Sequence, residues 1–323
     1  MEKISASHYL SGLVIVSIFS ATVSAVYSII LDNSLQFRPY DDLRISPLGR
    51  LLNPVIGATA YGFAALFSLH CSLQSQDSLK QIGWLLLMVL LLYTVHLTGS
   101  IAVWPALLLS GLLALGLRRG MRMKKVILLM TGVAAICGLV FATSYFLYPE
   151  FPLRLIPRTT SFRPDIWRVV IDIVVDKNPW VGLGLLDTGH LTVGELEYQH
   201  AHSIYFAGFC HGGLIGIALL AAVIVRGLRV VISASFPQES GGQTLNSNSS
   251  QLNPQVCSAA ATRALPNLAL VTLLYACVVF ALDGDGVWHK IDLTWIVFWI
   301  PISLCVLIDT QSETRSAGSD VSC

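Results

Sequence analysis

The sequence predicts an all-α protein that crosses a membrane several times. Of its 323 residues, 54% are hydrophobic and only 12% are charged, and the mean hydropathy is +0.68. An average soluble domain carries about 25% charged residues. The apolar residues also form uncharged runs of about 20 residues, which is the length one helix needs to cross a hydrocarbon core about 30 Å thick. Both observations predict a polytopic bundle of transmembrane helices.

Six uncharged runs are each long enough for one helix. The first follows eight mixed residues and has no small-residue cleavage site leading into a soluble domain, so we expect a membrane span there and no cleavable signal peptide. The runs lie at about 9–30, 51–72, 126–147, 203–225, 265–282 and 291–308, and only the last contains a charged residue, Asp292 at its edge.

A seventh run, Ile82 to Leu117, is too long for a single crossing. It has no Asp, Glu, Lys or Arg in 36 residues, and as one helix it would extend about 54 Å. Thr98-Gly99-Ser100, followed by Pro105, is the obvious break. We therefore expect a tight hairpin of two helices here and about eight spans in the whole chain.

The basic cluster between Arg118 and Lys125 orients the bundle, because cytoplasmic loops carry an excess of Lys and Arg. Counting from it places both termini inside and the loop 148–202 outside. We expect five spans in residues 1–147, a catalytic outer loop at 148–202 and three spans in 203–308. Residues 227–264 then form a polar cytoplasmic linker and 309–323 a cytoplasmic tail.

The distribution of polar residues argues against several classes of protein. None of the predicted spans contains an internal Asp, Glu, Lys or Arg, whereas ion-coupled transporters generally need such groups. A net charge of +1 gives no sign of nucleic-acid binding. The seven cysteines avoid the loop 148–202 and show neither disulfide nor metal-ligand spacing. We expect no metal and no cofactor, and chemistry on the outer face.

An amphipathic helix is predicted after Pro164, a residue that suits the first helical position. Asp165, Arg168, Asp172 and Asp176 share one face, with Trp167, Ile171 and Val174 on another. Such a helix lies on a membrane surface. Arg163 stands beside its N-terminus, where a guanidinium and free backbone amides suit a diphosphate.

Both arginines have simpler interpretations. Arg163 is also compatible with an interfacial arginine that extends toward water. Arg168 can pair with Asp165 and Asp172 on the helix surface, so Arg163 is the sharper candidate and Arg168 a supporting one.

The segment Asn178-Pro179-Trp-Val-Gly182-Leu-Gly184 ends that helix and makes a turn that glycine tolerates. By itself it indicates only a helix stop.

His200 and His202 stand where the loop returns to the membrane, and Ser203 can cap the helix that follows. A neutral imidazole can accept a proton from a sugar hydroxyl as it attacks, which is general base catalysis; a structural histidine is the alternative. His211 lies about 180° round the helix from His202, which predicts a packing or hydrogen-bonding role. Gly208, Gly212 and Gly216 predict close approach of another helix.

Together these motifs resemble the O-antigen ligase and polymerase superfamily of bacterial inner-membrane glycosyltransferases. The family's histidine motif matches His202-Ser203, nine residues, Gly213, two residues and Gly216. Its Arg-x-x-x-Trp and Asn-Pro-x-x-Gly-x-Gly elements match Arg163 to Trp167 and Asn178 to Gly184 in order and spacing. The likeness covers about residues 44–308.

The resemblance implies a GT-C-like helical bundle that transfers a glycan from undecaprenyl diphosphate without a metal. Its acceptor is a lipid A core sugar in the ligases and a second lipid-linked repeat unit in the polymerases; the histidine pattern favours the ligases. Arg163 would bind the diphosphate and His202 would act on the acceptor hydroxyl, with His200, Ser203 and Arg168 in support. The active face would be periplasmic, and the partners would be the donor, the acceptor and membrane lipids.

Two departures from the family pattern leave a degenerate, non-catalytic lipid-binding protein as an alternative. Family members usually have about twelve spans, so this chain resembles a short or N-terminally truncated member. Where the family often has Ser-Arg-Gly, this chain has Ser100-Ile101-Ala102, so one diphosphate-binding arginine is missing. The candidates to replace it are Arg38, Arg44, Arg50, Arg154 and Arg158.

Overall fold

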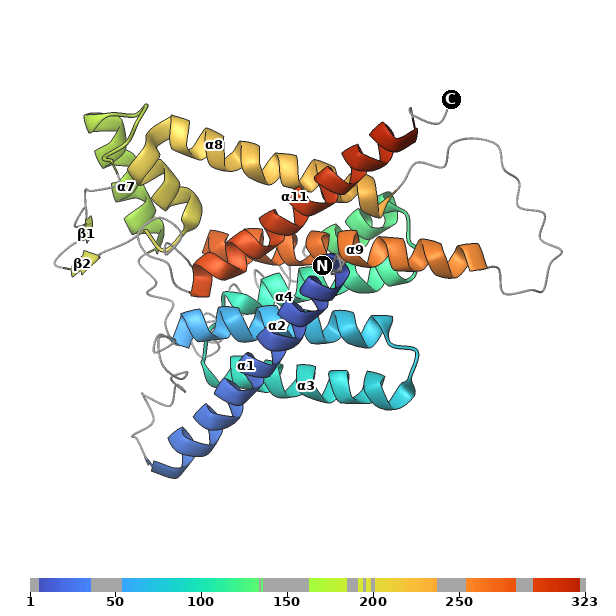
Figure 1. Ribbon diagram of the computed structural model, residues 1–323. Helices are drawn as coiled ribbons and strands as arrows, with labels where there is room; N and C mark the ends of the chain where they lie inside the picture. The colour runs from blue at the N-terminus through green and yellow to red at the C-terminus, as the bar shows by residue number, and fades with distance from the viewer. Residues whose placement is uncertain are drawn as a thin grey trace, which may run out of the picture.

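The computed structural model is a bundle of long helices with a smaller helical layer at one end (Figure 1). It describes residues 6–35, 54–133, 135, 163–184, 191–193, 196–198, 201–236, 254–282 and 293–319. The described helices are α1 (Ala6–Leu35), α2 (Pro54–Gln74), α3 (Ser78–Leu97), α4 (Val103–Arg118), α7 (Arg163–Lys177), α8 (Ile204–Ser235), α9 (Pro254–Leu282) and α11 (Leu293–Ser319).

The predicted all-helical membrane fold is confirmed. Six helices are long and apolar enough to cross a membrane, and they coincide with the predicted spans in α1, α2, α3, α8, α9 and α11. The helical hairpin is also present: α3 ends at Leu97 with Thr98 as its C-cap, Gly99 turns with a φ of 65°, and α4 follows as a shorter apolar helix. The remaining span, predicted at 126–147, is helical over residues 123–133, and most of it lies outside the described residues.

Two features differ from the sequence prediction. A short antiparallel hairpin, β1 (Leu191–Val193) with β2 (Leu196–Tyr198), pairs Leu191 with Tyr198; three-residue strands are too short to leave a periodic pattern. The predicted linker 227–264 is too long, because α8 continues to Ser235 and α9 already begins at Pro254.

Small residues let α2 and α9 occupy the centre of the bundle. About two thirds of α2 and 61% of the apolar segment of α9 are buried, against 17% for α3. Small side chains allow membrane helices to approach closely, and α2 has Gly57, Ala58, Gly62, Ala64 and Ala65. Four of the large aromatic rings that fill the core, Tyr61, Phe67, Tyr275 and Phe280, come from the same two helices.

A buried hydrogen bond marks the closest approach of these helices. The Tyr275 hydroxyl of α9 donates to the Thr59 carbonyl oxygen of α2 at 2.8 Å. A Cβ at Gly62 would collide with that hydroxyl and would lie 2.9 Å from Val103. Ser24 of α1 and Tyr61 of α2 share a second buried hydrogen bond at 2.9 Å. These polar contacts fix the packing of α1, α2 and α9.

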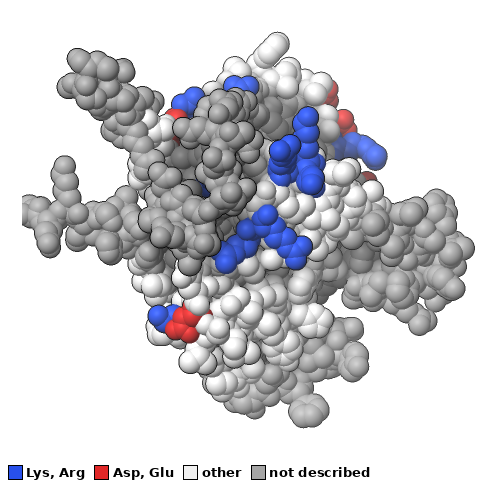
Figure 2. Space-filling view, turned by 90° about the vertical axis from the view of Figure 1, so that its right-hand side faces the viewer, with Lys and Arg blue, Asp and Glu red and all other residues white. Residues whose placement is uncertain are grey.

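The two ends of the bundle differ in chemistry. The layer formed by α7 and the first part of α8 lies at one end, whereas the α2–α3 connection and the C-terminal end of α4 lie at the other (Figure 1). Figure 2 shows Lys and Arg side chains gathered on that second end. The basic residues near it are Lys80, Arg118, Arg119, Arg122, Lys124, Lys125, Arg226 and Arg229.

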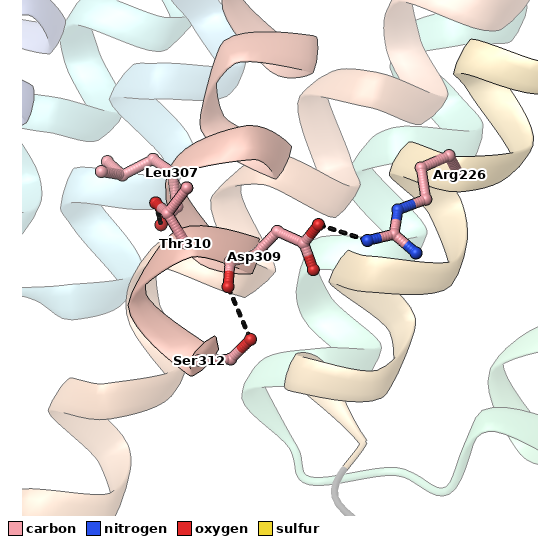
Figure 3. A network of polar contacts seen from close by, with 5 residues as sticks. All are labelled: Arg226, Leu307, Asp309, Thr310 and Ser312. Carbon is pink, nitrogen blue, oxygen red and sulfur yellow. Dashed lines mark hydrogen bonds and ion pairs between the residues drawn. The ribbon is translucent and has the colours of Figure 1, made fainter. Parts of the chain in front are cut away.

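An ion pair ties α8 to α11. Arg226 Nη2 lies 2.5 Å from Asp309 Oδ2 (Figure 3), with 68% and 31% of the two side chains exposed. Both residues lie just beyond the predicted spans, in turns that continue the helices. Exposed pairs contribute about 1 kcal/mol or less, so this contact orients two helix ends more than it stabilises the bundle.

We predict that Gly62→Ala destabilises the protein and that Tyr275→Phe partly reverses the effect. The added methyl group meets the tyrosine hydroxyl, and Phe lacks that hydroxyl. In a double-mutant cycle read from thermal unfolding in detergent, the coupling should be at least about 0.5 kcal/mol. Gly83→Ala on α3, where a Cβ meets nothing within 4 Å, is the control. Strictly additive effects would contradict this packing.

Candidate functional site

Helix α7 packs one face against α8 and the β1–β2 hairpin. Ile166, Val170 and Val174 are at most 1% exposed and pack in one cluster with Leu191, Ala201, Ala207 and Cys210. At 100° per residue, Arg163 lies only about 20° from Val170 on the helix wheel. The candidate arginine therefore belongs to the inward face, which agrees with its partial burial.

Arg168 lies on the opposite side of α7, about 160° from Val170. Its Nη1 is 3.7 Å from Asp165 Oδ1, and 76% of its side chain is exposed. The pairing expected from the sequence is therefore present with Asp165. Ile171, which the sequence placed with the apolar face, is 43% exposed; the buried stripe is centred one residue earlier, on Val170.

Trp167 joins α7 to the segment that contains the candidate histidine. Its indole N–H donates to the Ala201 carbonyl oxygen at 2.9 Å. The same ring stacks on Phe206 of α8, with centroids 4.7 Å apart and planes 6° from parallel. Arg163 lies one helical turn from Trp167, about 6 Å along the axis, and His202 directly follows Ala201. The two ends of the loop 163–202 therefore meet here.

His202 has an unusual backbone. Its φ is 52°, the one positive value at a non-glycine position among the described residues. Its neighbours Ala201 and Ser203 are 3% and 1% exposed, whereas His202 itself is partly exposed. Positive φ costs an L-residue free energy, so the surrounding packing must maintain it. His200, the second predicted histidine, lies outside the described residues.

Ser203 occupies the expected N-cap position of α8, but its side chain makes no cap hydrogen bond. The predicted side-chain cap is therefore wrong. Its carbonyl oxygen instead accepts the first helical bond, from Ala207 N–H at 2.8 Å.

Helix α8 is broken at Gly213, where φ is 57° and ψ is −152°. The Asn178–Gly184 turn supplies partners to both sides of the break. Leu183 and Gly184 N–H groups donate to the carbonyls of Cys210 and His211, at 2.8 and 3.1 Å. In return, Leu214 and Ile215 N–H groups donate to the carbonyls of Pro179 and Trp180, at 2.9 and 3.1 Å. Because helix ends leave such groups unpaired, the turn caps both halves of α8.

This contact requires glycine on both sides. A Cβ at Gly182 would lie 2.5 Å from the Cys210 carbonyl oxygen, and one at Gly213 would lie 2.6 Å from the Pro179 carbonyl oxygen. Gly182 and Gly184 also have φ of 66° and 87°, which favours glycine. Two motifs about 30 residues apart in the sequence are thus one structural unit, which we call the glycine lock: Asn178–Gly184 with Cys210–Ile215.

The glycines of α8 act differently from the prediction of a seam for another helix. A Cβ at Gly216 would lie 2.8 Å from the Gly208 carbonyl oxygen, and one at Gly212 would meet nothing within 4 Å. Gly208 and Gly216 thus contact each other within α8. The break at Gly213 folds the helix back on itself and brings them together (Figure 1). The expectation for His211 is confirmed: it is 8% exposed, and its Nδ1 lies 3.1 Å from the Gly184 carbonyl oxygen.

Comparison with known proteins finds similarity over the region that contains these motifs. The sequence profile of the O-antigen ligase family matches residues 86–221, which include α7, the β1–β2 hairpin, the glycine lock and His202. The O-antigen ligase of Pseudomonas aeruginosa is 24% identical over 283 residues, which is 86% of this chain. Over these residues the chain is similar to O-antigen ligases. It spans 61% of the length of that curated ligase.

Ile101, which stands where the resemblance led us to expect an arginine, lies at the same end of the bundle as α7. Ile101 follows the α3–α4 turn and is 46% exposed. The five arginines that could replace the missing arginine all lie outside the described residues.

Among the described residues, no group of three or more His, Cys, Asp or Glu side chains could hold a metal ion.

Sequence reasoning did not anticipate the contacts of Trp167 or the glycine lock. Trp167 was assigned only to an apolar helix face, and Asn178–Gly184 only to a helix stop. The positive φ values that glycine permits were foreseen, but hydrogen bonds between backbone groups so far apart in the chain leave no local pattern.

We predict that Gly213→Ala separates the two halves of the glycine lock, because its Cβ overlaps the turn and its φ is unfavourable. The free energy of unfolding should fall by about 1–3 kcal/mol or more, which would appear as a lower thermal midpoint in detergent. Gly212→Ala is the matched control: the neighbouring residue is helical and its Cβ is unobstructed, so that variant should be equal or more stable. Equal midpoints for the two variants would rule out the lock.

Proposed function

We propose that this chain is a glycosyltransferase that moves O-antigen polysaccharide from undecaprenyl diphosphate to a sugar hydroxyl of the lipid A core. The reaction takes place at the periplasmic face of the bacterial inner membrane, needs no metal and inverts the anomeric centre. The observation that carries the proposal is the contact of Trp167 with Ala201 and Phe206, because it brings the neighbourhoods of Arg163 and His202 together.

Arg163 is proposed to bind the donor diphosphate. Its place on the inward face of α7, at the first turn, combines a guanidinium with the positive end of the helix dipole. As the glycosidic bond breaks, negative charge grows on the leaving diphosphate, and a preorganised cation stabilises that charge. Arg168, paired with Asp165 on the exposed face, plays a supporting part at most.

His202 is proposed to accept the proton of the acceptor hydroxyl or to orient that hydroxyl. An imidazole titrates near neutral pH, which suits a general base. Attack from the side opposite the diphosphate is a single displacement and inverts the configuration. His200 and Ser203 are supporting residues in this proposal, and the buried Ser203 acts through the backbone that begins α8.

The proposed orientation follows the charge of the two bundle ends. Basic residues gather on the end opposite α7 (Figure 2), and cytoplasmic segments of membrane proteins are enriched in them. The α7 layer then faces the periplasm and both termini lie in the cytoplasm.

We predict that Arg163→Ala and His202→Ala each reduce transfer at least about 100-fold, the scale expected for losing a charge stabiliser or a general base. The assay uses purified protein with lipid-linked glycan and lipid A core. Arg168→Ala, on the same helix but exposed, should retain most of the activity. Normal membrane levels of all three variants exclude a folding effect. Full activity of either the Arg163 or the His202 variant would refute its assigned role.

A polymerase of the same superfamily is the second candidate, and the lipopolysaccharide of a deletion strain distinguishes the two. We predict core without any attached glycan, because a ligase performs the attachment itself. A single repeat unit on the core would instead identify a polymerase.

A non-catalytic relative that only binds the carrier lipid is a third candidate, which the isoleucine at position 101 favours. It would bind lipid-linked glycan in the same purified assay without turnover. Expression of this chain in the deletion strain tests whether the chain alone restores attachment of glycan to the core.

A further inference from the structure

We propose that Trp167 is a positioning residue that holds His202 in its reactive orientation. The inference rests on the proposed function of His202, and it assigns a role to a side chain that does not itself touch the reacting groups. Three features of the described structure carry it: the strained backbone of His202, the two contacts of the indole ring, and the burial of the residues on either side of the histidine.

The backbone at His202 requires an external constraint. A φ of 52° places the residue in the left-handed region, which histidine enters more readily than most residues but still at a cost. Without a constraint, the peptide would relax toward negative φ, and the imidazole would leave the helix start in a different direction. The partly exposed His202 side chain, between two buried neighbours, depends on this backbone conformation.

Trp167 supplies constraints on both sides of that residue. On the N-terminal side, its N–H donates to the carbonyl oxygen of Ala201, which belongs to the peptide bond that leads into His202. On the C-terminal side, its ring stacks on Phe206 in the first turn of α8. One rigid side chain thus holds the peptide before His202 and the helix after it.

The helix that carries Trp167 is itself fixed in place. Helix α7 is anchored by Ile166 and Val170, which are buried against Ala201 and Ala207, so the indole cannot move independently of the site. Because Arg163 lies one turn before Trp167 on the same inward side of α7, the same contact sets the spacing between the proposed diphosphate ligand and the proposed base. A reacting geometry that is misplaced by about 1 Å can cost 100-fold in rate.

Two substitutions separate the hydrogen bond from the stacking. Trp167→Phe keeps a ring against Phe206 and removes the donor. Replacement of Trp167 by benzothienylalanine, through a suppressed stop codon, keeps the size and shape of the indole and changes only N–H to sulfur. The matched control is Trp180→Phe, because Trp180 lies in the neighbouring turn and is 64% exposed.

We expect both Trp167 variants to lower kcat about tenfold, which corresponds to one lost hydrogen bond, while KM for lipid-linked donor and core acceptor stays within about twofold. Amide hydrogen exchange of residues 201–206 should accelerate in both variants. The thermal midpoint should change little for benzothienylalanine, since ring packing is retained. The Trp180 variant should match the wild type in every measurement.

The outcomes separate this inference from the function on which it rests. An active His202→Ala variant would overturn the proposed function itself. An inactive His202→Ala variant, together with wild-type kcat and wild-type exchange for benzothienylalanine, would overturn only the role of Trp167. If Trp167→Phe simply fails to fold, the isosteric variant still decides. A rise of about tenfold in KM without a fall in kcat would assign Trp167 to substrate binding and would also contradict the proposal.

Discussion

The glycine lock is the constraint on which the rest of the site depends. Helix α8 is interrupted at Gly213, and an interrupted helix leaves N–H and C=O groups without partners, which is costly in or near lipid. Four backbone hydrogen bonds from the Asn178–Gly184 turn satisfy those groups. Side chains are excluded from the contact because any Cβ at Gly182 or Gly213 would overlap opposing backbone. The end of α7 is thereby fixed against the break in α8.

From this fixed point, the positions of the candidate site residues follow. The turn determines how α7 lies on the first half of α8, and their apolar faces close over Ile166, Val170 and Ala207. Trp167 then reaches Ala201 and Phe206, and the chain enters α8 through His202 with a left-handed backbone. The membrane bundle contributes a stable support, built around α2 and α9, and the Tyr205 hydroxyl links α8 to the Cys277 carbonyl oxygen of α9 at 3.1 Å.

Most of the fold was readable from the sequence because transmembrane helices are specified locally. Uncharged runs of sufficient length predicted the spans, and Thr98-Gly99-Ser100 located the hairpin. The position of α7 followed from Pro164 and the helical spacing of its charges. The extensions of α8 and α9 beyond their spans were missed because polar residues such as Arg226 mark the edge of a span without ending a helix. The residues of the site were predicted, but the contacts that join them were not, since these contacts connect residues 27 to 39 positions apart.

The central claim is that Arg163 and His202 act in one site, Arg163 on the donor diphosphate and His202 on the acceptor hydroxyl. A cryo-EM structure of the protein with undecaprenyl diphosphate-linked glycan in a lipid nanodisc tests it most directly. The account predicts that the diphosphate contacts the Arg163 guanidinium and that the His202 ring faces the anomeric carbon from the opposite side. A donor held elsewhere, or the two side chains opening into separate compartments, would contradict it.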